Sequence, residues 1–350
     1  MKPSLLFLIA VVVLAIPLFP QQVPKGMIRG RVLDDSTGAP LPLANVFVSN
    51  STIGTAANGE GRFELRGVPI GTQQIVASIV GYEPVSYTAQ VNDSVVQVLQ
   101  FRLRARAVQM PGVDIEEKDP VEWRKHLQKF IDVFFGSTPN SSRCRILNPQ
   151  VLDFSYDEDG DKLVATAREP LDIENLALGY RFHCVLVLFT YSPQSFQYIG
   201  FTGFEPLVSH SVDEANQWKE NRRNAYYGSK RHFFQALIRN SARKEGFEVY
   251  NIRKDWLLSA LKKPAGFEMN IDGLLSPGNS PYEKKFDFQD LLQIVYRRGN
   301  VTRISLLELS GLSVTVFTNG LTANPLGLWT YGYWSTQRGA EMLPIDYEPE

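Results

Sequence analysis

The spacing of turns between Met27 and Arg106 restricts the fold of this chain more than any other feature. Turn-forming residues cluster about every eight to twelve positions, and the segments between them alternate apolar and polar side chains. A period of two places successive side chains on opposite faces of a strand. We therefore predict about seven short strands in this region, packed as a β-sandwich.

The predicted strands are bounded by residues that favour tight turns. Glycine and asparagine supply the positive φ angles that such turns require. The clearest alternating segments are residues 27–33, 44–49, 62–65, 73–80 and 95–103. In the last segment, Phe101 and Leu103 are expected to point into the sandwich, while Arg102 and Arg104 point outward.

The turn residues also fall in an order that is typical of one domain family. They read Gly30-x-Val32, Asp35-x-Thr37-Gly38-x-Pro40-Leu41, Ala44-Asn45-Val46, Gly54-Thr55, Asn58-x-x-Gly61-x-Phe63 and Gly81-Tyr82. This stretch of about 80 residues resembles the carboxypeptidase-like regulatory domain, because glycines, prolines and aromatic residues fall in register. One departure is Asn58, where the family usually has Asp, and Asn tolerates the same turn.

The resemblance implies a transthyretin-like, or prealbumin-like, β-sandwich that is related to carbohydrate-binding-like folds. It also implies a module that carries no catalytic residues of its own. In Bacteroidota, such domains commonly stand at the N-terminus of secreted and outer-membrane proteins, including TonB-dependent receptors. We assign residues 26–106 to this module.

Residues 1–22 are predicted to be a secretory signal peptide. Lys2 precedes an apolar run over residues 5–16, which Pro17 ends. A membrane span would need about 20 apolar residues, which is more than this run provides. A lipid anchor would need a cysteine directly after the run, but the first cysteine is Cys144. We expect export across the inner membrane to the periplasm, the outer membrane or the cell surface, with no transmembrane span once the signal is removed.

The pattern changes after residues 107–119, which we interpret as a last strand and linker. An apolar face at helical spacing follows Pro120, and a second helical stretch lies between residues 213 and 240, with a break before Ser229. Strands are expected at residues 151–156, 163–167, 180–191, 196–201, 282–297, 301–309 and 312–317. Residues 120–350 are therefore predicted to form an α+β domain with an antiparallel sheet, which makes the whole chain β-rich with two domains.

This second region also resembles other sequences. The matching residues are Leu178-Gly179-Tyr180, Asn221-Arg222-Arg223-x-Ala225-Tyr226-x-Gly228-Ser229, His232-Phe233, Gly332-Tyr333-Trp334-Ser335, Met342-Leu343-Pro344 and Tyr347. They are similar to uncharacterised C-terminal regions that follow carboxypeptidase-like regulatory domains in secreted Bacteroidota proteins. The resemblance implies a cellular context and no particular activity.

Charge and cysteine content exclude several classes of protein. The chain has 36 Lys and Arg against 37 Asp and Glu, a formal net charge of −1. It therefore has no overall positive field, and nucleic acid is not an expected partner. Two cysteines are too few for a disulfide scaffold or a four-thiolate zinc site. Cys144 and Cys184 could pair in an oxidising compartment, and a buried free thiol at Cys184 is the alternative.

The sequence holds no complete catalytic motif of fixed spacing, and no cofactor or metal is expected. A zinc carboxypeptidase needs a His-x-x-Glu pair, and no histidine of the chain has Glu three residues later. The series Asp157, Asp159 and Asp161 lacks the Gly and Glu of a calcium loop, and a solvated hairpin turn explains it better. The paired carboxylates of a glycosidase have no sequence signature, so that activity stays open.

One basic and aromatic segment is a candidate for ligand binding. Arginine forks suit phosphate or carboxylate groups, and aromatic faces suit sugar rings. The candidate residues are Arg222, Arg223, Tyr226, Tyr227, Arg231 and His232. The alternative is a charged outer helix face over an aromatic core, with Arg222 or Arg223 paired to Glu220 or Asp213.

These observations favour a non-catalytic binding or interaction protein of the cell envelope. Its expected partner is an envelope glycan or another envelope protein. A glycan-active hydrolase that uses paired carboxylates is the enzymatic alternative. An accessory of outer-membrane transport or assembly is the third interpretation.

Overall fold

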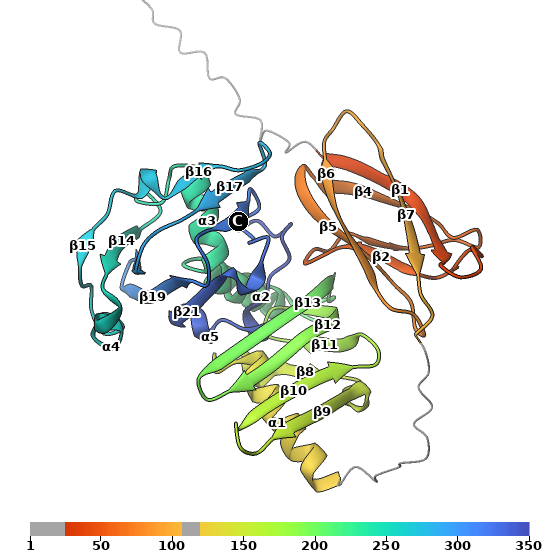
Figure 1. Ribbon diagram of the computed structural model, residues 1–350, viewed down its shortest axis with the longest axis horizontal. Coiled ribbons are helices and arrows are strands. Elements are labelled where there is room, and N and C mark those ends of the chain that lie inside the picture. Colours follow the sequence, from red (N-terminus) through yellow and green to blue (C-terminus); the bar gives the residue numbers. More distant parts are fainter. Residues whose placement is uncertain (1–24, 107–119, 350) are drawn as a thin grey trace, which may run out of the picture.

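Seven strands form an N-terminal β-sandwich in the computed structural model, which describes residues 25–106 and 120–349. They are β1 (Lys25–Asp34), β2 (Asn45–Val48), β3 (Gly54–Ala56), β4 (Arg62–Pro69), β5 (Gly71–Ser78), β6 (Val85–Val91) and β7 (Gln97–Leu103). One sheet has the order β4-β1-β7 and the other has the order β3-β2-β5-β6 (Figure 1). The predicted sandwich is confirmed.

Alternation along the strands builds the sandwich core. Phe101 and Leu103 are fully buried, whereas Arg102 and Arg104 are exposed, as predicted. The turn before β4 depends on Asn58, whose Oδ1 accepts hydrogen bonds from the backbone N–H groups of Glu60 and Arg62 at 3.0 and 2.9 Å. Asn therefore fills the position that the family gives to Asp.

A long helix and a six-stranded sheet follow. The helix is α1 (Pro120–Phe135), and the strands are β8 (Cys144–Ile146), β9 (Leu152–Asp157), β10 (Lys162–Ala167), β11 (Leu171–Asn175), β12 (Tyr180–Ser192) and β13 (Ser195–Pro206). All neighbouring strands are antiparallel, and β13 pairs with β12 at one edge. Phe130 and Phe134 of α1 pack on the inner face of the sheet, against side chains such as Phe182 and Phe189.

Helices α2 (Val212–Tyr226) and α3 (Lys230–Ile238) lead into two further antiparallel sheets. The remaining elements are β14 (Phe247–Ile252), α4 (Leu257–Ala260), β15 (Phe267–Glu268), β16 (Leu275–Pro277), β17 (Glu283–Phe286), β18 (Leu291–Arg298), β19 (Val301–Leu309), β20 (Val314–Phe317), β21 (Leu328–Gly332) and α5 (Tyr333–Thr336). The sheet orders are β15-β14-β18-β19-β21 and β16-β17-β20. Phe233 and Phe234 of α3 pack against both sheets, so α3 is central to this part of the core.

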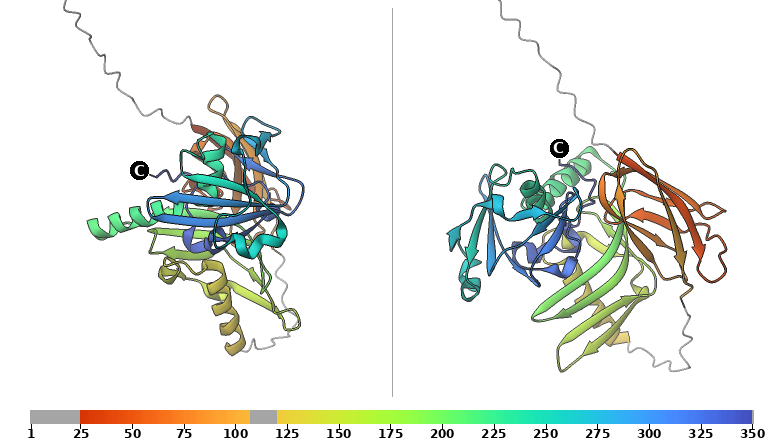
Figure 2. Two further views of the ribbon diagram at one scale, coloured as in Figure 1. Left: turned by 90° about the vertical axis from the view of Figure 1, so that its left-hand side faces the viewer. Right: turned by 45° about the horizontal axis from the view of Figure 1, so that its top comes forward.

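The sandwich meets the rest of the chain through the outer face of β2 and β5, which we call the docked face. Phe47 and Val76 of this face pack against Val185 of β12. Ser51 forms a parallel bridge with Gly203 of β13. The right-hand view in Figure 2 shows the sandwich beside the edge of the six-stranded sheet. The docked face is therefore apolar at its centre.

The C-terminal segment also joins the two parts. Ile345 is buried in the sandwich core, and its backbone N–H donates to the carbonyl oxygen of Asn50 at 2.6 Å. The backbone N–H of Thr52 donates to Oδ1 of Asp346 at 3.0 Å. Residues 344–348, which we call the C-terminal strap, thus lie between the sandwich and the second region.

The predicted architecture of the second region is confirmed as α+β with antiparallel sheets, but one predicted strand is wrong. Residues 282–297 form two strands of different sheets, because Asp290 has a φ of 61° and turns the chain between β17 and β18. The signal peptide at 1–22 and the linker at 107–119 lie outside the described residues. The division into separately folding domains at 26–106 and 120–350 stays a prediction.

Candidate functional site

A pocket of about 650 Å³ lies where the sandwich, α2, the start of β12 and the C-terminal strap meet. Its lining combines cations, carboxylates and aromatic rings, namely Thr52, Tyr180, Asn216, Lys219, Glu220, Arg222, Arg223, Pro344, Asp346, Tyr347 and Glu348. We call it the junction pocket. Two of the six predicted ligand-binding residues, Arg222 and Arg223, line it.

Helix α2 positions these two arginines. Its first turn is capped by Ser211, whose side chain accepts from the backbone N–H of Glu214. The inner side of the helix carries Trp218, which is buried against Gly179. Gly179 has a φ of 66°, and a Cβ there would lie 2.2 Å from the Trp218 ring, so this close packing requires glycine.

Arg222 is held by the protein itself. Its Nε donates to the carbonyl oxygen of Leu178 at 2.6 Å, and its Nη2 donates to that of Gly179 at 3.1 Å. The guanidinium lies 4.1 Å from the centre of the Tyr180 ring. Arg222 therefore fixes the loop before β12 as well as lining the pocket, and the paired carboxylate that the sequence suggested is replaced by backbone carbonyls.

Arg223 differs from its neighbour. Its side chain is exposed and has no hydrogen bond or ion pair to any residue that the structure describes. Tyr347 lines the same pocket, and its pKa is raised to about 12 by burial and by Tyr180, although the positive charges of Arg222 and Arg223 oppose the shift. Arg223 is therefore a cation that is free to meet an anionic group beside an aromatic ring.

Carboxylates are also present in the lining of the junction pocket. Asp346 accepts from the backbone and the hydroxyl of Thr52, so this carboxylate joins the strap to the sandwich. Glu220 and Glu348 are the other two acidic residues of the lining. A ligand here would need hydrogen-bond donors as well as acceptors, together with one negatively charged group for Arg223.

Arg231 anchors the strap and does not line the pocket. Its guanidinium donates to the carbonyl oxygens of Pro344 at 2.9 Å, Ile345 at 2.5 Å and Tyr347 at 3.1 Å. Burial lowers the pKa of Arg231. This arginine positions the wall that carries Tyr347, which is a structural role.

Tyr226 and His232 are part of the core. Nδ1 of His232 accepts from the backbone N–H of Gly228 at 2.9 Å, so Nε2 carries the proton and donates to Glu245 at 2.7 Å. Burial lowers the pKa of His232, although the hydrogen bond to Glu245 opposes the shift. The Tyr226 hydroxyl donates to Oε1 of Gln235 at 2.7 Å. Neither side chain is available to a ligand.

Tyr227 is covered by another side chain. The guanidinium of Arg298 lies 3.6 Å from the centre of its ring. Of the six candidates, the structure therefore places Arg222 and Arg223 at a pocket, and the aromatic core that was the alternative explanation accounts for Tyr226, Tyr227 and His232.

The two cysteines are free. Cys144 is opposite Asn175 of β11, which is opposite Tyr180 of β12, so Cys144 and Cys184 lie two strands and four residues apart. The distance between β8 and β12, which lie two strand spacings apart, is already about 10 Å, and a disulfide needs Cα atoms within about 7 Å. The thiol of Cys184 is buried, with Sγ 3.0 Å from the Tyr198 hydroxyl.

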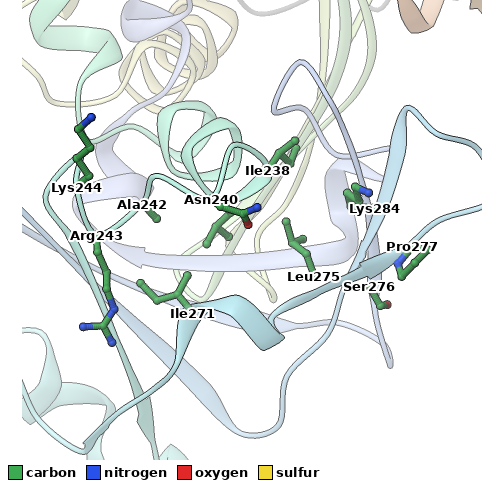
Figure 3. Close-up of a pocket in the computed structure, with 11 residues that line it drawn as sticks. Ile238, Asn240, Ala242, Arg243, Lys244, Ile271, Leu275, Ser276, Pro277 and Lys284 are labelled. Atoms are coloured by element: carbon green, nitrogen blue, oxygen red, sulfur yellow. The ribbon is translucent and has the colours of Figure 1, made fainter.

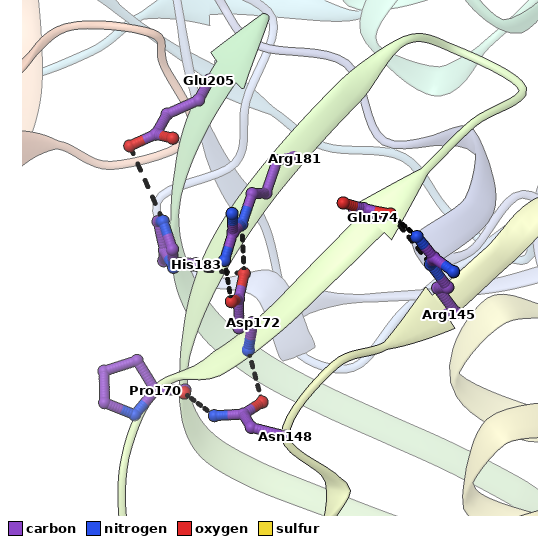
Figure 4. Close-up of polar contacts among 8 residues, drawn as sticks. All are labelled: Arg145, Asn148, Pro170, Asp172, Glu174, Arg181, His183 and Glu205. Atoms are coloured by element: carbon purple, nitrogen blue, oxygen red, sulfur yellow. Dashed lines mark hydrogen bonds and ion pairs between the residues drawn. The ribbon is translucent and has the colours of Figure 1, made fainter. Parts of the chain in front are cut away.

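A polar network covers the outer face of the six-stranded sheet (Figure 4). Arg181 of β12 forms an ion pair with Asp172 of β11, which lowers the pKa of that carboxyl group. His183 lies 3.6 Å from both Asp172 and Glu205. No group of three potential metal ligands occurs among the described residues. Cross-strand pairing accounts for this network.

A smaller pocket of about 370 Å³ lies at the C-terminal end of α3 (Figure 3). Aliphatic and basic side chains line it, among them Leu237, Ala242, Ile271, Arg243, Lys244 and Lys284. Arg243 is paired with Glu268 at 2.8 Å. The sequence analysis missed this pocket, since its residues come from separate elements without a shared motif.

Most residues of the junction pocket were not predicted from the sequence either. Tyr180, Asp346 and Tyr347 are far from α2 in the sequence, and only the fold of the strap brings them together. Within the resemblance noted for the second region, Tyr180 and Tyr347 were among the matching residues, which was the one signal that pointed to them. None of the helices in residues 25–106 and 120–349 is both long and apolar enough to span a membrane.

The solved structures to which this chain is similar share little sequence identity with it and have low TM-scores. The backbone protein of pilus 2b from group B streptococcus is 16% identical over 24% of this chain and 42% of its own, with a TM-score of 0.21. A cohesin–X-dockerin complex of Acetivibrio cellulolyticus is 20% identical over 23% of this chain and 58% of its own, with a TM-score of 0.20. The chain thus spans less than two thirds of either structure.

A third structure aligns with much more of the chain. It is a Bacteroides uniformis protein whose carbohydrate binding is a provisional assignment, 9% identical over 84% of this chain and 99% of its own, with a TM-score of 0.21. No curated protein sequence matches the chain. A family model matches at residues 28–115, the region of the sandwich. The N-terminal part of the chain is a CarboxypepD_reg-like domain.

Proposed function

We propose that this chain is a non-catalytic binding protein of the cell envelope, and that the junction pocket takes an anionic carbohydrate. Export would follow from the signal peptide predicted at residues 1–22. The observation that carries the proposal is the free guanidinium of Arg223 in a pocket of about 650 Å³. A pocket of this size lies within the range of about 300–1,000 Å³ that is usual for small ligands.

The chemistry of the lining supports an acidic sugar. Arg223 can form a forked pair with a carboxylate or phosphate group. The Tyr347 ring offers an apolar surface, and Asn216 and Glu220 can bond sugar hydroxyl groups. The fold related to carbohydrate-binding-like domains, which the family resemblance implies, points in the same direction.

The test is a binding panel on the purified chain from Gln22 onward. Polyuronates, phosphorylated glycans and matched neutral glycans would be added, with the unfolding temperature as the first readout and calorimetry as the second. A ligand that binds only the native state raises the unfolding temperature, and the stabilisation grows with the logarithm of one plus the ratio of the free ligand concentration to Kd. We expect stabilisation by an acidic glycan and none by its neutral counterpart.

Arg223→Ala is the decisive variant, and Arg124→Ala is its control. Both side chains are exposed on helices, and Arg124 lies on α1, away from the pocket lining. Loss of one charge-assisted fork should weaken binding about tenfold or more in Arg223→Ala, while Arg124→Ala should bind as the wild type. Equal affinities in the two variants, or no glycan that binds, would overturn the proposal and favour a protein partner.

A glycan-active hydrolase is the second candidate, because Glu220, Asp346 and Glu348 line the same pocket. Asp346 is already bonded to Thr52, so Glu220 and Glu348 would have to act as the pair. Chromatography of any bound polymer after long incubation separates the two functions. Shortened products that disappear in Glu348→Gln would establish hydrolysis, and an unchanged polymer would support binding alone.

A further inference from the structure

The outer face of the sheet β4-β1-β7 carries a concentration of arginine. Successive side chains of a strand point to opposite faces, so the residues between the buried positions all point outward. The outward arginines are Arg29 and Arg31 of β1, Arg62 and Arg66 of β4, and Arg102 of β7, and all five are exposed. We call this surface the arginine face.

The arginine face is turned away from the rest of the chain. The docked face belongs to the other sheet of the sandwich, where Phe47 and Val76 contact Val185. The two sheets pack through the core that contains Ile28 and Ile75, so their outer faces lie on opposite sides. No part of the described chain covers the arginine face, which leaves it open to a partner.

Positive charge on this face exceeds what its own carboxylates neutralise. Glu64 pairs with both Arg29 and Arg66, and Glu60 pairs with Arg62 at 3.1 Å. Five arginines thus meet two glutamates, in a chain whose formal net charge is −1. Arg102 has no hydrogen bond or ion pair to any described residue. The excess of positive charge is therefore confined to this face, and acidic residues elsewhere in the chain balance it.

One pair of arginines conflicts with the folding of the sheet. Arg31 and Arg62 are direct cross-strand partners, and both side chains are exposed. Among the described residues, Arg31 donates only to the carbonyl oxygen of Glu60, at 3.1 Å, and the one carboxylate beside the pair, that of Glu60, is bound to Arg62. Like charges at directly opposed positions destabilise an antiparallel pair. Local arrangements that disfavour folding are typical of functional surfaces. The pairing therefore points to a role in binding an anionic partner.

The same face also presents aliphatic side chains. Val98 of β7 is 79% exposed, and it lies next to Arg29 in the register of β1 and β7. Val96, just before β7, is 44% exposed. No aromatic side chain is among the exposed residues of β1, β4 and β7. A glycan would gain no stacking surface here, whereas a lipid interface accepts both basic and apolar groups.

We propose that the arginine face docks the protein on an anionic lipid membrane, with the guanidinium groups on lipid phosphates and the Val98 side chain at the boundary of the acyl chains. Each basic residue at an anionic surface strengthens association, and the effect decays within a Debye length of about 10 Å at 0.1 M salt. This surface is separate from the junction pocket and does not depend on the glycan proposal.

The test uses the chain from Gln22 onward, so that the apolar leader cannot bind lipid. Co-sedimentation with phosphatidylglycerol vesicles, phosphatidylcholine vesicles and mixtures of the two would be measured at low and high salt. We expect binding to anionic vesicles that weakens steeply with salt, and none to phosphatidylcholine.

The double variant Arg31→Thr/Arg102→Thr tests the surface. Neither side chain is paired with a carboxylate, so the fold should survive, and thermal unfolding would check this. Its matched control is Arg124→Ala/Lys162→Ala, which removes two exposed cations from α1 and β10. We expect the first variant to lower the partition coefficient roughly tenfold or more at low salt and the control to leave it unchanged.

Three results would overturn the proposal. The wild type could fail to bind phosphatidylglycerol vesicles, or the two double variants could lose binding equally. A soluble polyanion such as heparin could bind the wild type while vesicles do not, which would assign the face to a soluble polyanion. Val98→Thr keeps the shape of the side chain and replaces one methyl group by a hydroxyl group, so it should weaken vesicle binding without changing heparin binding.

Discussion

The two outer faces of the sandwich share strand geometry and differ in what their outward positions carry. On the docked face, Phe47 and Val76 point outward and are buried against β12. On the arginine face, the outward positions hold exposed cations such as Arg29 and Arg31. Both sheets bury their inward side chains equally well in one core. Folding therefore requires apolar residues at the inward positions, whereas the residues at the outward positions determine what each face contacts.

The largest expected difference between the faces is in stability. Phe47→Ala removes a ring that is only 8% exposed, and we expect it to lower the free energy of unfolding by about 3 kcal/mol. Val98→Ala, on the arginine face, should change it by less than about 0.5 kcal/mol. Urea denaturation monitored by tryptophan fluorescence would measure both. Equal losses would mean that the arginine face is also covered.

A similar contrast is expected within α2, between neighbouring arginines. Arg222→Ala removes the side-chain donor of the Leu178 carbonyl group, while that of Gly179 keeps the backbone N–H of Leu207, and should cost about 2 kcal/mol. Arg223→Ala should stay within about 0.5 kcal/mol of the wild type. Thermal unfolding of the two variants would distinguish a structural arginine from one that is free for a ligand. A cost at Arg223 as large as that at Arg222 would contradict this distinction.

On the arginine face itself, two substitutions should have opposite signs. Arg31→Thr removes the repulsion from Arg62 together with an exposed hydrogen bond to the carbonyl oxygen of Glu60, and should on balance raise the free energy of unfolding by up to about 0.5 kcal/mol. Arg29→Thr removes the partner of Glu64 and should lower it by a similar amount, about 0.5 kcal/mol. Calorimetry on the two single variants and on Arg124→Ala would show whether the sign changes. A loss of stability in Arg31→Thr would remove the argument from like-charge pairing.

The smallest expected effect is a contribution to the pH dependence of stability that comes from the arginine face and not from the docked face. The hydrogen bond from Arg29 holds the pKa of Glu64 below its ordinary value. Its stabilising contribution is complete above the ordinary value near 4.5 and is lost as the pH falls below it through the lower pKa of the folded state. Glu64→Gln should therefore lose less stability than the wild type between pH 6 and pH 3. Val185→Ala, at the apolar docked face, should keep the slope of the wild type.

The sandwich could be predicted from the sequence because its information is local. Alternating segments and turn residues such as Asn58 and Gly61 specify strands and their reversals over short distances. Alternation likewise predicted correctly that Phe101 is buried and Arg102 is exposed. Strands β3 and β6 were not placed. Residues 54–56 are too few to show a period, whereas residues 85–91 do alternate apolar and polar side chains, so this strand could have been predicted from the same pattern.

The candidate site was predictable only in part. Arg222 and Arg223 were found because basic residues beside aromatic ones form a recognisable segment. Which of the two is free depends on the loop at Leu178, and His232 was shown to be structural only by its contacts with Gly228 and Glu245. Such contacts join residues whose proximity depends on tertiary packing, and periodicity carries no information about them.

The position of Ile345 has a consequence for how the protein is made. This side chain completes the core of the sandwich, although the strands around it are synthesised long before residue 345. Until the strap arrives and Arg231 binds its carbonyl groups, one edge of that core is exposed. The core of the sandwich is therefore complete only after the strap has been made, and a ribosome stalled before the strap would leave a nascent chain with an open hydrophobic edge.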